Sequence, residues 1–137
     1  MKVYLAGNMH RLWRERVTIG VGLEGGDSSI TWLIPLPTSD KAKPGGGDKD
    51  LYFVRDKTLI RQADLVFGLI EDYDGEHNRH SGLSAELGMA HAWGIPIILL
   101  NLLPEIHSFE FLEKLADSVF YDWEEAIRAL RFACTII

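Results

Sequence analysis

Two carboxylates and a phenol are the side chains in this sequence best suited to chemistry, namely Glu86, Asp56 and Tyr4. A carboxylate can act as a nucleophile, and a carboxylic acid can act as a general acid. Each residue also has a simpler interpretation. Glu86 can complement a helix dipole from the first turn, Asp56 can be a solvated helix residue, and Tyr4 can be a core residue. A fold that brings the three together would favour the chemical interpretation.

One strand–helix–strand unit is expected to position Glu86. Residues 65–70 and 96–100 are continuous apolar runs, which are typical of strands buried on both faces of a parallel sheet. Residues 81–94 lie between them and carry apolar side chains at helical spacing. Ligands of open α/β sheets bind beyond the carboxyl ends of the strands. The start of this helix and the loop before it are therefore expected at a site.

The rest of the chain continues the alternation of strands and helices. We expect strands over residues 3–6, 29–36 and 118–121, and helices over 9–17 (ending no later than about Gly22), 50–63, 109–116 and 122–131, with Asp122 as an N-cap. We expect Leu12, Trp13 and Val17 on the buried face of the first helix, and Leu51, Val54, Leu59 and Ile60 on one face of the second. This pattern predicts one α/β domain over residues 1–137, with three layers and a doubly wound, five-stranded parallel sheet of flavodoxin-like or Rossmann-like order.

The predicted topology offers a way for the three side chains to meet. In a flavodoxin-like order the first strand is central, so the Tyr4 phenol can point toward Glu86. Asp56 lies eight residues before Asp64, which is about two helical turns before the third strand. The N-terminal half of its helix can face the same crevice as Glu86.

Composition narrows the classes of partner and compartment. The chain has 137 residues and a net charge of -6, which disfavours a nucleic-acid polymer as partner because phosphate backbones bind basic surfaces. Cys134 is the only cysteine, so no internal disulfide is possible. We see no signal peptide and no apolar stretch long enough to span a membrane. We therefore expect a cytoplasmic protein without a membrane partner.

Two polar loops and a group of arginines have more than one interpretation. The segment from Pro37 to Asp48 is either a lid or a plain surface loop, and it lacks the pattern of a nucleotide P-loop. Acidic residues and histidines follow the third strand; they are more typical of a solvated loop than of a metal site, and we expect no metal (Asp72, Asp74, Glu76, His77 and His80). We expect the arginines of the first helix to solvate its outer face, with Arg11 a candidate ligand contact (Arg11, Arg14 and Arg16).

Three separated segments resemble the nucleoside 2-deoxyribosyltransferases and the related enzymes that hydrolyse 2'-deoxynucleoside 5'-monophosphates. They are Lys2-Val3-Tyr4-Leu5-Ala6-Gly7, then Asp56 with Ala63-Asp64-Leu65-Val66, then Ser81-Gly82-x3-Glu86-Leu87-Gly88-x-Ala90 with Gly94-x-Pro96-Ile97. The resemblance covers about the first hundred residues. It implies Glu86 as nucleophile on the anomeric carbon, Asp56 as the acid near the departing base and Tyr4 as the phenol that orients Glu86.

The resemblance also implies a set of substrate-binding residues and no cofactor. That set is Gly7, Asn8, Met9, Arg11, His80, Ser81 and Gly82. The chain departs from the family in two places. His80 stands where the transferases often have an Asp, and Met9 and His10 stand where they have aromatic residues. The hydrolases hold phosphate with a Ser and an Arg after the first strand, where this chain has Asn8 and Arg11, with Ser81 near the helix start.

These observations favour one function and leave others open. The leading hypothesis is transfer of 2-deoxyribose between nucleobases through a covalent deoxyribosyl-Glu86 intermediate, with a nucleoside or nucleotide as donor and a second base as acceptor. The alternative enzymatic function is hydrolysis of a 2'-deoxynucleoside 5'-monophosphate. The non-enzymatic alternatives are a non-catalytic nucleotide-binding module and a structural subunit. We also expect a homo-oligomer, a dimer or an assembly of dimers, in which the apolar residues 132–137 pack on their own domain or on a partner.

Overall fold

Strands and helices alternate along the whole described chain. The computed structural model describes residues 1–8, 12–22, 30–35, 48–72 and 80–135. The elements are β1 (Lys2–Ala6), α1 (Leu12–Gly22), β2 (Thr31–Leu33), α2 (Asp48–Gln62), β3 (Leu65–Ile70), α3 (Ser81–Ala92), β4 (Ile97–Asn101), the 3-10 turn η1 (His107–Phe109), α4 (Glu110–Leu115), β5 (Ser118–Phe120) and α5 (Trp123–Thr135).

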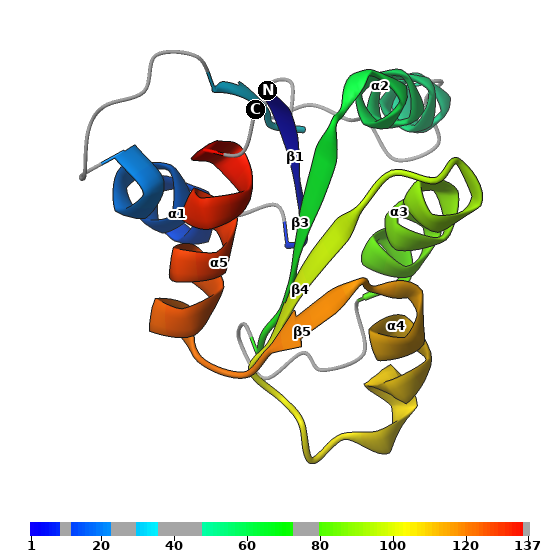
Figure 1. Ribbon diagram of the computed structural model, residues 1–137. Coiled ribbons are helices and arrows are strands. Elements are labelled where there is room, and N and C mark those ends of the chain that lie inside the picture. Colours follow the sequence, from blue (N-terminus) through cyan, green and yellow to red (C-terminus); the bar gives the residue numbers. More distant parts are fainter. Residues whose placement is uncertain (9–11, 23–29, 36–47, 73–79, 136–137) are drawn as a thin grey trace.

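The five strands form one parallel sheet in the order β2-β1-β3-β4-β5. Helices α1 and α5 cover one face of this sheet, while α2, α3 and α4 cover the other (Figure 1). The predicted three-layer, doubly wound α/β architecture is therefore confirmed. β1 lies inside the sheet, between β2 and β3, so residues near its carboxyl end are close to the crevice where the strand order reverses.

Two apolar cores fill the spaces between the layers, because successive side chains of a strand point to opposite faces. Val3 and Leu5 of β1 pack toward α1 and α5, whereas Tyr4 packs toward α2 and α3. All six residues of β3 are buried, as its continuous apolar run predicts. A side chain at Gly68 would lie 3.3 Å from Leu87, so α3 packs closely on the sheet at this point.

Among the side chains that the structure describes, which do not include Leu51, the helical faces differ from prediction at two positions. Leu12 is 72% exposed, because the inward stripe of α1 runs through Trp13, Val17 and Val21, and Leu12 is one residue out of step with it. Val54 of α2 is also exposed, since Ile60 defines the buried face and Val54 lies off it. The predictions for Trp13, Val17 and Ile60 are confirmed, and Leu59 is partly buried against the same core.

Several element ends also differ from prediction. β2 is limited to Thr31–Leu33, the residues that pair with β1. By contrast, α1 ends at Gly22, which is the limit predicted for it. A side chain at Gly20 would lie 3.1 Å from Ile127, so α5 packs against this glycine. No helix within the described ranges is long and apolar enough to cross a membrane.

The last helix continues four residues beyond its predicted end. α5 runs to Thr135 because Cys134 extends the buried stripe of Ala126 and Leu130 by one more turn. Most of the expected apolar tail is therefore helix, and its Phe132 is 67% exposed. The predicted N-cap is confirmed, since the backbone N–H of Glu125 donates to Asp122 Oδ1 at 2.9 Å.

Candidate functional site

The structure brings Tyr4 and Glu86 together. The Tyr4 hydroxyl donates to Glu86 Oε1 at 3.0 Å, across 82 residues of sequence. Leu83 and Leu87 anchor α3 in the core and set its rotation, so Glu86, three residues after Leu83, points at β1. Glu86 lies in the second turn of α3 and not in the first as expected, which removes a helix-dipole role as its explanation.

The two oxygens of the Glu86 carboxyl group have different environments. Oε1 accepts the hydrogen bond from Tyr4. Oε2 is shielded from solvent and accepts no hydrogen bond from the residues that the structure describes. Such an oxygen retains its lone pairs for an electrophile.

The pKa of Glu86 is raised to about 7, mainly by burial and also by the negative charge of Asp56. The Tyr4 hydrogen bond and the positive charges of Arg14 and Arg55 lower this pKa and oppose the rise. The carboxyl group is thus poised between its two protonation states near neutral pH, a property of catalytic carboxyl groups. The group can act as a nucleophile once it is ionised.

Asp56 is the second carboxylate near this point. It lies on α2, its side chain is 19% exposed, and its Oδ1 accepts from Arg55 Nε at 3.0 Å. Its charge acts on both Tyr4 and Glu86. Burial and these two carboxylates raise the pKa of Tyr4 well above its usual value, so the phenol stays a proton donor. Tyr4 and Glu86 are therefore in contact and Asp56 lies within electrostatic range of both, and we call these three residues the Glu86 cluster.

Arg14 is a neighbour of this cluster that sequence reasoning missed. The prediction that it solvates the helix surface is wrong, because only 2% of the residue is exposed. Its Nη1 donates to Asn8 O at 2.6 Å, and its Nη2 lies 3.3 Å from both Leu5 O and Gly7 O. The spacing of Arg14 to Val17 and Val21 matches the buried face of α1 and is the signal that could have indicated its position.

The turn after β1 is built tightly around Arg14. Trp13 Nε1 donates to the same Asn8 carbonyl at 2.8 Å, and the Arg14 guanidinium carbon lies 4.5 Å from the centre of the Trp13 ring. A side chain at Gly7 would lie 2.9 Å from Trp13 Cζ2 and 3.3 Å from Leu69 O, so only glycine fits. Arg14, which binds the Gly7 and Asn8 carbonyls, lies within electrostatic range of Glu86.

The remaining predicted binding residues lie at or before the start of α3, or outside the described ranges. His80 is buried and meets the Phe109 ring edge-on, with 4.8 Å between centroids. Gly82 is exposed, and a side chain added there would meet nothing within 4 Å. Ser81 begins α3, whereas Met9 and Arg11 lie outside the described residues.

No group of three or more potential metal ligands gathers anywhere in the described part of the chain. Asp74, Glu76 and His77, which the sequence offers as candidates, lie outside that part, as does the segment from Pro37 to residue 47.

Comparisons with known proteins identify the fold. No protein-family model matches the sequence, and no curated protein matches it. A 2-deoxyribosyltransferase from Bacillus psychrosaccharolyticus has a similar structure, with a TM-score of 0.68 and 24% sequence identity over 93% of this chain and 90% of the transferase.

Two further structures are similar over almost their whole length. A CMP N-glycosidase from Clostridium botulinum has a TM-score of 0.57 and 21% identity, covering 96% of this chain and 99% of the glycosidase. A 2-deoxyribosyltransferase from Leishmania mexicana has a TM-score of 0.59 and 17% identity, covering 96% of this chain and 97% of the transferase. The chain shares the fold of these enzymes.

Proposed function

We propose that this protein cleaves the N-glycosidic bond of a nucleoside or nucleotide and transfers 2-deoxyribose to a second nucleobase. The arrangement of Glu86 is the observation that carries the proposal. One of its oxygens is held by Tyr4, the other is enclosed without a hydrogen bond from the described residues, and its pKa is near 7. The fold shared with two 2-deoxyribosyltransferases and a CMP N-glycosidase supports it.

The reaction starts when ionised Glu86 attacks the anomeric carbon of the sugar through Oε2. The bond from that carbon to the base nitrogen breaks as the new carbon–oxygen bond forms, and the sugar passes through a state with oxocarbenium character. Asp56, in its protonated form, gives the departing base a proton. Tyr4 keeps Oε1 in place throughout, which fixes the direction of attack.

The second half of the reaction returns the site to its starting state. A nitrogen of the acceptor base attacks the anomeric carbon, the bond to Glu86 breaks, and the carboxylate is released. The proton lost by the acceptor returns to Asp56. Overall configuration at the anomeric carbon is retained, because two displacements occur in sequence.

Hydrolysis of a nucleoside 5'-monophosphate is the alternative, with water in place of the acceptor base. The similarity to a CMP N-glycosidase favours it. None of the described residues caps the start of helix α3 with its side chain, and the backbone N–H groups of a helix N-terminus are suited to bind a phosphate.

Incubation of the protein with deoxynucleosides and deoxynucleotides, with and without an acceptor base, distinguishes these functions. A new nucleoside that forms only with acceptor present supports transfer, whereas free base without acceptor supports hydrolysis. Glu86→Ala should abolish either reaction. Activity within tenfold of the parent in Glu86→Ala contradicts the proposal, and ligand binding without turnover in the parent indicates a binding module instead.

A further inference from the structure

A groove separate from the Glu86 cluster lies between α1 and α5. Its volume is about 630 Å³, and its lining residues are Arg16, Gly20, Trp123, Glu124, Ile127, Arg128 and Arg131. Helices α1 and α5 cover one face of the sheet, while α2 and α3, which carry Asp56 and Glu86, cover the other (Figure 1). The proposed reaction uses none of the residues that line this groove.

Positive charge dominates the groove although the chain as a whole is acidic. Three arginines and one glutamate line it, which is a net charge of +2 in a chain of net charge -6. Arg128 pairs with Glu124 at 3.1 Å, but both side chains are more than 60% exposed, so this pair is readily exchanged for another partner. Arginine binds phosphate groups with two parallel hydrogen bonds, which makes such a lining suited to them.

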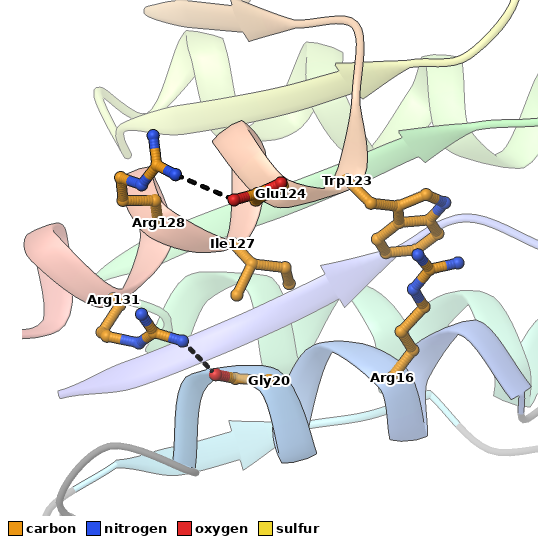
Figure 2. Close-up of a pocket in the computed structure, with 7 residues that line it drawn as sticks. All are labelled: Arg16, Gly20, Trp123, Glu124, Ile127, Arg128 and Arg131. Carbon is orange, nitrogen blue, oxygen red and sulfur yellow. Dashed lines mark hydrogen bonds and ion pairs between the residues drawn. The ribbon is translucent and has the colours of Figure 1, made fainter.

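The middle of the groove is apolar. Figure 2 shows Ile127 between the two α5 arginines on one side and the stacked pair of Arg16 and Trp123 on the other. The Arg16 guanidinium carbon lies 4.4 Å from the centre of the Trp123 ring. Because Gly20 has no side chain, Ile127 packs against the α1 backbone and forms a floor on which a ring can rest.

We propose that this groove binds a nucleoside phosphate, with the phosphate at Arg128 and the base over Ile127 and Trp123. Arg131, whose Nη2 donates to Gly20 O at 2.6 Å, adds its positive charge beside the phosphate. A phosphate monoester carries a charge of about -1.5 to -2 at neutral pH, which matches the +2 of the lining better than a single carboxylate does. The groove also falls within the size range of ligand pockets, roughly 300–1,000 Å³. The site is a second one, distinct from the proposed substrate site at Glu86.

The test is a titration with AMP, and with adenosine as the phosphate-free comparison, in a Glu86→Gln background that prevents turnover. The reporter is the NMR signal of the Trp123 indole N–H, assigned by its loss in Trp123→Phe. We expect AMP to shift this signal with at least tenfold higher affinity than adenosine. The Trp93 indole, which lies under Arg61 on the other side of the sheet, is the internal control.

Three variants test the proposal through their affinity for AMP. One should bind AMP more weakly, one more tightly, and one as the parent does. Arg128→Gln should lower the affinity for AMP about tenfold, because it removes a side chain that binds the phosphate. Glu124→Gln should raise the affinity for AMP several-fold, because it removes the carboxylate that pairs with Arg128. Arg61→Gln, the matched arginine that stacks on Trp93, should change nothing. The altered side chains are exposed, so folding should be unaffected.

The proposal is overturned if the Trp123 signal does not respond to millimolar AMP, or responds equally to adenosine. It is also overturned if Arg128→Gln and Glu124→Gln change the affinity in the same direction. No outcome depends on glycosidic activity, so failure of the proposed function would leave this test valid.

Discussion

At the scale of single residues, the raised pKa of Glu86 has a consequence for the pH dependence of the reaction. The nucleophile must be ionised, so kcat/KM should rise with pH through a midpoint of about 7. The Tyr4 hydrogen bond favours the ionised form, so Tyr4→Phe should move this midpoint to higher pH. Rate profiles of both proteins between pH 5 and 9 check this. An unchanged midpoint in Tyr4→Phe would show that the hydrogen bond does not control Glu86.

The same pKa predicts a trade-off between activity and stability. A carboxyl group whose pKa is higher in the folded state binds its proton more tightly there, so its contribution to stability is lost as pH rises from about 4.5 to about 7. Glu86→Gln lacks this charge. It should be more stable than the parent at pH 8, by about 1–2 kcal/mol after allowance for partial exposure of the residue.

Calorimetric unfolding of the parent and Glu86→Gln at pH 5 and pH 8 measures this difference. The advantage of Glu86→Gln should be smaller at pH 5, where the parent is largely protonated. An equal difference at both pH values would mean that Glu86 is not held at a raised pKa.

Asp56 should affect the rate at which the base departs and not the affinity for the substrate. Asp56→Asn keeps the shape of the side chain but cannot supply a proton, so kcat should fall roughly 10²–10⁴-fold while substrate affinity changes little. A substrate whose base leaves without protonation is the control, and its turnover should be nearly unaffected. Equal losses for both substrates would assign Asp56 to structure.

At the scale of elements, Arg14 joins α1 to the turn that follows β1. Arg14→Met removes the Arg14 hydrogen bonds to the carbonyls of Asn8, Gly7 and Leu5, of which Asn8 keeps its bond from Trp13 Nε1. We expect it to lower the unfolding free energy by about 1–3 kcal/mol and to reduce kcat/KM. Arg16→Met, on the exposed face of the same helix, is the control. It loses only an exposed stack on Trp123 and should lower stability by no more than about 0.5–1 kcal/mol. Denaturant titration measures both. A similar effect of the two changes would contradict a specific role for Arg14.

The elements differ in how well the sequence predicts them, and the reason is physical. The continuous apolar run of β3 can only be a buried strand, so its ends at Leu65 and Ile70 are predictable. The ends of β2 are not predictable in this way, because they depend on how many residues of β1 pair with this edge strand. The end of α5 depends on whether Cys134 finds a buried place on the sheet.

The contacts of the site also differ in how well the sequence predicts them. Tyr4 and Glu86 are 82 residues apart, and their contact follows from the strand order that the βαβ pattern predicts. Burial of Arg14 cannot be foreseen from charge, because it depends on three backbone carbonyls that only the folded turn directs at one point. The α1–α5 groove likewise exists only once two helices distant in sequence lie side by side.

At the scale of the whole molecule, we predict a homo-oligomer in which a neighbouring subunit helps to close the crevice at Glu86. The expected apolar tail cannot serve as the argument, since most of it is helix α5. A better reason is α2, where Phe53 and Val54 are 56% and 57% exposed within one turn of Asp56. Adjacent exposed apolar side chains beside a site are typical of a surface that another chain covers, and a symmetric dimer is the commonest closed assembly.

Light scattering at micromolar concentration measures the mass of the assembly. We expect at least a dimer for the parent, and a shift toward monomer in Phe53→Ser/Val54→Ser together with a fall in kcat/KM. Phe111→Ser, which changes an equally exposed aromatic residue on α4, is the control and should keep the parent mass. A monomeric parent with full activity would show that each chain closes its own site, because then no contact across α2 would be needed for Asp56 and Glu86 to work together.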